Sequence, residues 1–274
     1  MFSQIIKHKL ALFGLIIIVL MVFAALLSPV LAPYPPHRQD LSQGLTPPGP
    51  GHILGRDKLG RDICSRLIFG ARISLLVGVV TVGICSLAGI CIGAVAGYFG
   101  GLLDEIIMRL IDILLAFPGI LLAIALMAVL GPGLQNVISA LCLIGWIGYA
   151  RLVRGEVLSL KEREFITAAK AQGLGNARII FRHILPNIMA PVIVQISFSL
   201  AGTIVAEAGL SFLGLGVQPP TPSWGAMLNE GRQFMLLAPH ISIFPGIAIM
   251  LVVLSFNFIG DALRDVLDPK RKDV

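Results

Sequence analysis

The stretch EFITAAKAQGLGNARIIFRHILPN, residues 164–187, is the longest polar interruption in a chain that is otherwise built largely of apolar residues. The chain has 274 residues, of which 56% are hydrophobic and 13% are charged. Such a composition leaves too few polar side chains to cover a water-soluble globule, so the sequence predicts a membrane protein. The fold then depends on the uncharged runs that lie on either side of the quoted stretch.

The uncharged runs are long enough for six crossings of the hydrocarbon core, each of which takes roughly 20 residues of α-helix. The sequence therefore predicts an all-α membrane protein with six transmembrane helices. A turn at Gly131, Pro132 and Gly133 divides the longest run into two spans. The expected spans are 10–32, 73–99, two within 113–150, 187–215 and 241–260.

Lysine and arginine concentrate in the segments that a cytoplasmic N-terminus would place inside the cell, which would hold 14 of the 21 basic residues. Six of the remaining basic residues lie between Arg38 and Arg72, several of them beside acids. The positive-inside rule predicts that both the N-terminus and the C-terminus are cytoplasmic. The net charge of +6 then reflects this rule and the attraction of anionic lipid, and it does not call for a nucleic acid.

These spans divide the chain into four parts. Residues 1–32 form an N-terminal anchor helix, which is retained because its uncharged run exceeds the apolar part of a cleaved signal peptide. Residues 33–72 form an extracytoplasmic loop followed by a lead-in whose arginines are expected to face solvent or headgroups. Residues 73–260 form a five-helix core with a cytoplasmic loop at 151–186, and residues 261–274 form a cytoplasmic tail. Four cysteines without paired spacing predict neither a disulfide framework nor a zinc site.

Gly89, Gly93 and Gly97 recur every four residues and therefore share one face of the second expected span. Three missing Cβ atoms in register let another helix approach closely, which favours a packing face over ordinary glycine enrichment. In the third span, Arg109 and Asp112 have the spacing of a pair on one face. The proline of the sequence AFPG, residues 116–119, should weaken or kink that helix.

Glu207 is the one acid deep in the fifth hydrophobic segment, so it is a candidate polar site within the membrane. A proton relay would use several such groups, and no basic residue lies within a turn or two of Glu207. These observations favour a structural carboxyl that is satisfied by hydrogen bonds. The neighbouring GLSFLGLG, residues 209–216, lacks the second glycine of a nucleophile turn and a convincing base, which argues against a membrane hydrolase.

The quoted stretch predicts two short helices joined by a glycine. Ser159 and Glu162 form a capping-box pattern, which predicts that a helix begins near residue 160. Gly173 should end that helix, and Asn176 should cap the next one. Pro186 should break or bend the chain where it enters the fifth span.

The face of the first short helix that carries Phe165, Ala168, Ala169 and Gln172 has two interpretations. Its basic surroundings would suit an amphipathic helix that lies on anionic lipid. Two alanines at its centre bury little area in a bilayer, but they allow a protein surface to come close. The small residues and the glycine turn favour docking in a protein groove, although the residues alone leave both interpretations open.

The stretch TAAKAQGLGNARIIFRHILP, residues 167–186, resembles the cytoplasmic signature of the permease subunits of ATP-binding-cassette importers. That signature reads Glu-Ala-Ala, three residues, Gly, nine residues, Ile, one residue, Leu-Pro. Thr167 stands where the acid is usual, and His183 stands where Ile is usual. The positions that match at the correct spacing are Ala168, Ala169, Gly173, Leu185 and Pro186.

Four further motifs resemble the second permease subunit of the dipeptide, oligopeptide and nickel importers. They are LGRDKLGRDICSRLIFGARISL, MRLIDILLAFPGILLAIAL, GLSFLGLGVQPPTPSWG and GDALRDVLDP. The resemblance implies the type I importer architecture, in a bacterial or archaeal cytoplasmic (inner) membrane. It also implies a homologous permease subunit, two ATPase subunits and an extracytoplasmic substrate-binding protein as partners, beside the lipid bilayer.

In that family, the signature loop forms a coupling helix that sits in a cleft of the ATPase subunit and transmits nucleotide-driven closure. The resemblance thus implies that the ATPase-coupling residues are Thr167, Ala168, Ala169, Gly173, Leu185 and Pro186. The chain itself has no Gly-x4-Gly-Lys-Ser/Thr phosphate loop. We therefore expect a transport subunit that is not an enzyme and binds no cofactor or metal, with ATP hydrolysed by the partner subunits.

The five histidines are scattered through loops and ends, which favours di- or oligopeptides as the substrate over nickel, the alternative within the same family. A rival from another class is a self-contained secondary transporter. Such a transporter would predict several buried charges and an inverted repeat, and the sequence shows neither convincingly.

Overall fold

The computed structural model describes residues 8–267, which are nearly all helical and contain no β-strand. This confirms the predicted all-α fold. The helices are α2 (Lys9–Leu26), α3 (Ser28–Leu31), α4 (Ile63–Phe99), α5 (Gly101–Leu115), α6 (Gly119–Leu130), α7 (Leu134–Lys161), α8 (Glu164–Ala171), α9 (Asn176–Ile179), α10 (Leu185–Phe212), α11 (Trp224–Gly231) and α12 (His240–Leu267). Short 3-10 turns cover Leu41–Gln43 and Arg232–Phe234, and a π-helical segment, η2, covers Ile180–Ile184.

Five helical segments are long and apolar enough to cross a membrane, namely α2, α4, α7, the continuous stretch 176–212, and α12. The pair α5 and α6 adds a sixth crossing if the two helices are taken together. The axes of this pair differ by 84° across a short break. Five of the six predicted crossings are thus continuous helical segments, and the bent pair α5 and α6 stands at the place of the sixth.

The break between α5 and α6 falls at the sequence AFPG, residues 116–119. Pro118 has extended backbone and caps α6, so the expected kink is a complete interruption. The prediction that this span begins at 113 was wrong, because α5 begins at Gly101. Gly100 and Gly101 both have positive φ angles, 65° and 62°, and these reverse the chain directly after α4.

Helix α4 begins ten residues earlier than the predicted second span, because Asp62 caps it at Ile63. The carboxylate of Asp62 accepts a hydrogen bond of 2.7 Å from the backbone N–H of Ser65. Residues 63–72 therefore form the first turns of the 37-residue helix α4, and Arg72 among them is exposed, as the lead-in prediction expects. Arg66, in the first turns of α4, is buried instead of facing solvent.

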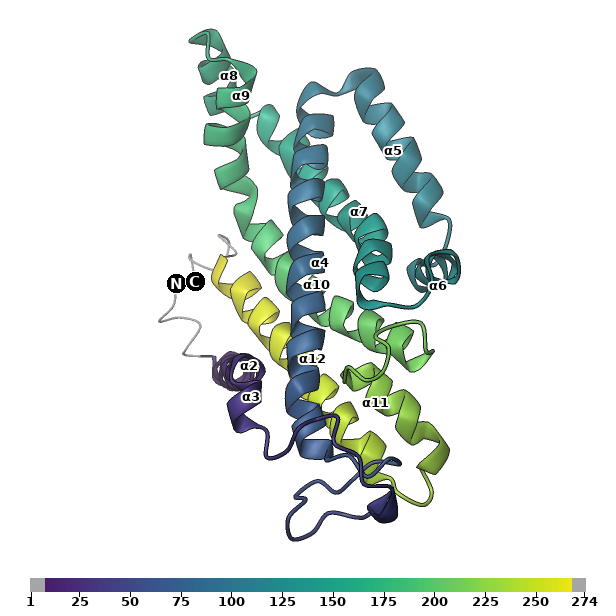
Figure 1. Cartoon of the computed structure of the whole chain (residues 1–274). Helices are drawn as coiled ribbons and strands as arrows, with labels where there is room; N and C mark the ends of the chain where they lie inside the picture. Colours follow the sequence, from purple (N-terminus) through teal and green to yellow (C-terminus); the bar gives the residue numbers. More distant parts are fainter. Residues whose placement is uncertain (1–7, 268–274) are drawn as a thin grey trace.

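Figure 1 shows α4 passing through the middle of the molecule, with α8 and α9 at one end and α11 at the other. We call these the α8 end and the α11 end. Helix α4 packs along α7, and α10 and α2 both pack against α12. Gly14 of α2 lies against the backbone of Ser255, whereas Ala25 belongs to the buried cluster that contains Ala248 and Val252, so α2 and α12 run antiparallel.

Two further segments outside the expected spans are helical. The segment 217–225 is irregular only as far as Ser223, whose hydroxyl accepts a hydrogen bond of 3.2 Å from Ala226 N–H and caps α11. The buried Trp224 anchors this helix by donating a hydrogen bond of 3.0 Å to the carbonyl of Leu67 in α4. Helix α12 continues to Leu267, so 261–267 of the predicted tail is helical, while 268–274 and the basic start at 1–7 lie outside the described residues.

Candidate coupling surface and buried polar sites

Helix α7 continues as far as Lys161, so the expectation that a helix begins near residue 160 was wrong. Val153 and Val157 of α7 are fully buried, and this packing carries the helix through the apparent capping box. Glu162 ends α7 without acting in a capping box, and α8 begins at Glu164 after the extended backbone of Arg163.

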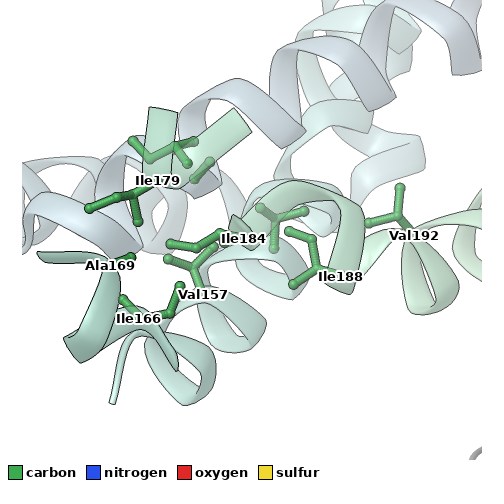
Figure 2. Close-up of a cluster of buried hydrophobic side chains, with 10 residues drawn as sticks. Val157, Ile166, Ala169, Ile179, Ile184, Ile188 and Val192 are labelled. Carbon is green, nitrogen blue, oxygen red and sulfur yellow. The ribbon is translucent and has the colours of Figure 1, made fainter. Parts of the chain in front are cut away.

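The inner face of α8 is fixed by a buried apolar cluster at the α8 end (Figure 2). Ile166 and Ala169 of α8 pack with Val157 of α7, and the cluster continues through Ile179, Ile184, Ile188 and Val192. Because the cluster takes residues from α4, α7, α8, α9, η2 and α10, it joins α8 to the ends of three membrane-crossing helices. A displacement of α8 therefore cannot leave α7 and α10 unaffected.

The outer face of α8 carries Phe165, Ala168 and Gln172, all of which are exposed. The Phe165 side chain is 44% exposed, so a large apolar side chain is accessible on this face of α8. The residue spacing predicted Ala169 on this same face, but Ala169 is buried and belongs to the inner face. The two alanines of the signature therefore have different surroundings, since only Ala168 is available to a partner.

Gly173 ends the turn after α8 in a Schellman arrangement. Its N–H donates to the carbonyl of Lys170 at 2.9 Å, and the N–H of Leu174 donates to the carbonyl of Ala169 at 3.2 Å. The φ angle of Gly173 is +74°, and an added Cβ would meet no atom within 4 Å. The requirement for glycine at this position is therefore conformational and not one of space.

The backbone N–H groups of α9 are not capped by Asn176, contrary to the prediction, because Gly175 occupies the N-cap position. The Oδ1 atom of Asn176 instead accepts a hydrogen bond of 2.9 Å from the hydroxyl of Tyr98 in α4. The ammonium group of Lys170 lies 5.8 Å from the centroid of the same tyrosine ring. Tyr98 thus contacts α8 and α9 together, and we call residues 164–179 the α8–α9 unit.

Of the predicted break or bend at Pro186, the break is absent, because this residue follows a π-helical turn and lies in the first turn of α10. The N–H of Leu185 reaches back to the carbonyl of Ile180, and the side-chain amide of Asn187 donates to the carbonyl of His183 at 2.6 Å. These bonds keep the chain hydrogen-bonded on both sides of the proline. Of the remaining signature residues, Thr167 and Pro186 are exposed and Leu185 packs against the buried cluster.

The three glycines of α4 lie directly against α7. An added Cβ at Gly89 would come within 2.4 Å of the Tyr149 Cβ, and one at Gly93 within 2.5 Å of the Ala150 carbonyl oxygen. At Gly97 the distance to the Arg154 carbonyl oxygen would be 3.0 Å. The absence of side chains at these positions is what allows α4 and α7 to pack so closely.

Glu207 is fully buried in α10, and serine hydroxyls surround its carboxyl group. Ser211 donates to it at 2.7 Å, and Ser74 of α4 donates at 3.1 Å. Within residues 8–267, no ion pair involves Glu207, so its arrangement is that of a hydrogen-bonded structural carboxyl. Arg109 and Asp112, which the spacing suggested as a pair, share an exposed side of α5 but form no ion pair in the described structure.

A buried ionic cluster at the α11 end was missed by the sequence analysis. Arg66 contacts both Asp57 and Glu230, and Arg61 contacts the same two acids, each at 2.6 Å. Glu230 belongs to α11, so the cluster ties the loop before α4 to a helix far along the chain. The only local signal was the close alternation of bases and acids in LGRDKLGRD, residues 54–62. Nearby, a hydrogen bond from Ser42, together with Arg56, lowers the pKa of Asp40.

A family model described as "Binding-protein-dependent transport system inner membrane component" matches residues 89–273. A second model, described as the N-terminal TM domain of oligopeptide transport permease C, matches residues 1–48. The first of these alone covers more than half of the chain.

Curated relatives match along nearly the whole chain. The dipeptide transport system permease protein DppC of Alkalihalophilus pseudofirmus is 50% identical over 271 residues, which cover 99% of this chain and 89% of the relative. The di/tripeptide transport system permease protein DppC of Pseudomonas aeruginosa is 46% identical over a match that covers 97% of this chain and 90% of the relative. The glutathione transport system permease protein GsiD of Pectobacterium atrosepticum is 51% identical over a match that covers 82% of this chain and 75% of the relative.

Among solved structures, inward-facing conformations of the MetNI methionine ABC transporter match with a TM-score of 0.60. The match covers 74% of this chain and 96% of that chain, and the sequences are 18% identical, which shows a shared fold only. The chain therefore belongs to the family of binding-protein-dependent transport system inner membrane components, as a multi-pass inner-membrane ABC importer permease of the peptide/nickel group.

Proposed function

We propose that this chain is the permease subunit of an ATP-driven importer of di- or oligopeptides. Together with a second, homologous permease it forms the substrate pathway, and an extracytoplasmic binding protein delivers the substrate. The observation that carries the choice of substrate is the set of relatives named for dipeptide, di/tripeptide and glutathione transport, at 46–51% identity. Glutathione is itself a tripeptide, so all three names describe short peptides.

We further propose that the α8–α9 unit couples the chain to the ATPase subunits. Phe165 and Ala168 offer an apolar, closely approachable outer face, and Ile166 and Ala169 fasten the opposite face to α7 and α10. Coupling requires contacts that differ between the inward-facing and outward-facing states. Helix α8 is exposed on one side and packs on the other side in the buried cluster with α7 and α10. A change in its contacts with the ATPase can therefore be transmitted to these membrane-crossing helices.

We also propose that both termini and the α8 end are cytoplasmic, and the packing supports placing all three on the same side of the bundle. Because α2 and α12 run antiparallel, Lys9 and Leu267 lie toward the same side. Gly260 of α12 lies against Phe198 of α10, and Arg264 shares a cavity with Asn187 and Glu156. The end of α12 therefore lies toward the start of α10, which is the side of the α8–α9 unit.

The coupling proposal is tested by Phe165→Asp, which adds a charge to the outer face of α8. Leu236→Asp is the matched control, because Leu236 is a fully exposed apolar residue at the α11 end. The permeases are co-expressed with their ATPase subunits and purified in detergent. Phe165→Asp should lose most of the co-purified ATPase and the ATP-dependent uptake of labelled dipeptide, whereas Leu236→Asp should retain the ATPase. Normal ATPase association in Phe165→Asp would contradict the proposal.

A further inference from the structure

A cavity of about 720 Å³ lies along the first half of α10, between α7 and α12. Its polar wall takes Glu156 from α7, Asn187 and Gln195 from α10, and Arg264 from α12. Apolar residues of the same three helices, such as Phe198, form the rest of the wall. Sites for small molecules in proteins have volumes of roughly 300–1,000 Å³. The cavity therefore has the size of a binding site for a small organic molecule.

The two charged groups of the wall have opposite signs and belong to different helices. Glu156 is partly buried and Arg264 is exposed, and neither of them forms an ion pair within residues 8–267. Helix α10 packs against both α7 and α12, so the two charges border the cavity from either side of α10. This arrangement favours a ligand with an ammonium group at one end and a carboxylate at the other.

Neutral acceptors lie on α10, between the two charges. Pro191 is inside α10 and has no N–H, so the carbonyl oxygen of Asn187 lacks its usual helical partner. The Nε2 atom of Gln195 donates to the hydroxyl of Ser199 at 3.3 Å. The Oε1 atom of Gln195 has no partner among the described residues and remains accessible. The wall thus offers acceptors for the N–H groups of a ligand.

These groups match a short peptide. Its amino terminus pairs with Glu156, its carboxyl terminus pairs with Arg264, and its backbone N–H groups reach the acceptors on α10. Helices in contact have axes about 8–10 Å apart, so α7 and α12 are at most about 16–20 Å apart, and the two charged side chains take up part of that gap. An extended di- or tripeptide, which spans about 7–10 Å, fits the remainder.

A phospholipid with an ethanolamine headgroup carries the same two charges. Its acyl chains, however, would lie against Gln195 and leave the accessible amide oxygen without a donor. A peptide supplies that donor from its own backbone. The wall therefore favours the peptide over the lipid.

We propose that this cavity binds a short peptide by both of its charged termini, on the cytoplasmic side of the membrane. Glu156 binds the amino terminus and Arg264 binds the carboxyl terminus. The inference rests on the proposed function, because it takes a short peptide as the transported substrate and the α8 end as cytoplasmic.

Binding is measured by saturation-transfer NMR on the purified complex of both permeases and the ATPase subunits. The binding protein is left out, so that the peptide has no soluble receptor. The probes are trialanine and N-acetyl-trialanine amide, which lacks both terminal charges. Trialanine should bind at least about 10-fold more tightly, because the capped peptide loses two charge-assisted hydrogen bonds. Equal binding of the two peptides would overturn the proposal.

Two variants assign each terminus to its residue. Glu156→Gln should weaken trialanine binding by about 10-fold and should bind N-acetyl-trialanine as well as trialanine, because the amino terminus no longer has a charged partner. Arg264→Gln should likewise bind trialanine amide as well as trialanine. Glu105→Gln and Arg109→Gln are the matched controls, since these residues are exposed on α5 and do not line the cavity.

Thermal unfolding and ATPase association should be the same in all four variants, which separates a contact with the peptide from a role in folding. If Glu156→Gln and Arg264→Gln bind trialanine as tightly as the unmodified complex does, the proposal is wrong.

Two other occupants of the cavity are distinguished by further measurements. Trialanine should bind equally in nanodiscs of phosphatidylglycerol with and without phosphatidylethanolamine, and loss of binding with phosphatidylethanolamine would assign the cavity to the lipid. Residues 268–274 follow directly on Leu267, which lines the cavity. A chain that ends at Leu267 should bind trialanine as the full chain does, and binding only after this truncation would assign the cavity to the tail.

The proposed function and the assignment of the cavity fail on different results. If the complete complex with its binding protein takes up no short peptide, the proposed function is wrong. If it takes up trialanine but the membrane complex binds trialanine no better than the capped peptide, only the assignment of the cavity is wrong.

Discussion

The hydroxyl of Tyr98, near the end of α4, donates a hydrogen bond of 2.9 Å to Oδ1 of Asn176, the first residue of α9. The ring of the same tyrosine faces the ammonium group of Lys170 in α8. One side chain of the central helix thus holds both parts of the α8–α9 unit. The orientation of the unit is fixed by α4 as well as by the buried cluster beneath it.

Tyr98→Phe should loosen the α8–α9 unit, because it keeps the ring but removes a hydrogen bond worth about 0.5–1.5 kcal/mol. Amide hydrogen exchange in residues 164–179 should become faster by roughly 2- to 10-fold. Tyr34→Phe is the control, since its hydroxyl donates to the carbonyl of Gly51 in a loop far along the chain from the unit. Unchanged exchange in Tyr98→Phe would mean that the cluster alone holds the unit.

Gly173→Val should disrupt the turn after α8, because a β-branched residue at a φ of +74° costs at least about 1–2 kcal/mol. Gly175→Val should be tolerated, since Gly175 has a φ of −66° and equally open surroundings. Both variants are compared by hydrogen exchange in residues 164–179 and by co-purification of the ATPase subunits. Gly173→Val should show faster hydrogen exchange in this segment and should lose the co-purified ATPase subunits. Equal behaviour of the two variants would refute the conformational role of Gly173.

Gly93→Ala should destabilise the chain by about 1–3 kcal/mol, because the new Cβ collides with the α7 backbone and not with a movable side chain. Gly83→Ala lies in the same helix, and its Cβ would meet no atom within 4 Å, so better helix propensity should make this variant equally or more stable. Thermal unfolding in detergent measures both effects. If the two alanines had the same effect, the close packing of α4 on α7 would not limit stability.

Arg66→Met should cost about 3–5 kcal/mol, since it leaves the buried Asp57 and the partly buried Glu230 with a single arginine between them. Arg72→Met, on the exposed side of the same helix, should change stability by less than about 0.5 kcal/mol. Adding Glu230→Gln to Arg66→Met restores the charge balance and should recover part of the loss. A double variant no more stable than Arg66→Met alone would show that charge balance does not govern the cluster.

The sequence was sufficient for features that depend on local composition. The uncharged runs located the membrane-crossing helices because burial of apolar residues in lipid needs no distant partner. The four-residue spacing of Gly89, Gly93 and Gly97 indicated a packing face because neighbours on a helix follow from its geometry alone. Gly173 could likewise be identified as a helix end from its position between two helical patterns.

Features that depend on residues far apart in the chain could not be read from the sequence. Arg66 and Glu230 are 164 positions apart, so the start of α4 looked like a charged, solvated segment. The end of α7 was misjudged because packing around Val157 carries that helix through a sequence that would cap an isolated one. Ala168 and Ala169 are adjacent and identical in type, and only the buried cluster distinguishes the inner alanine from the outer one.

Helix α6 has consequences for how the chain is made. Its 12 residues are about 18 Å long, well short of the roughly 30 Å of hydrocarbon. The break at Pro118 also prevents α6 from extending α5 in a straight line. Ala123 and Met127 of α6 are covered by Val137 and Ala140 of α7, which the ribosome synthesises later. We therefore expect α6 to integrate stably together with α7, as a helix hairpin and not as a single helix.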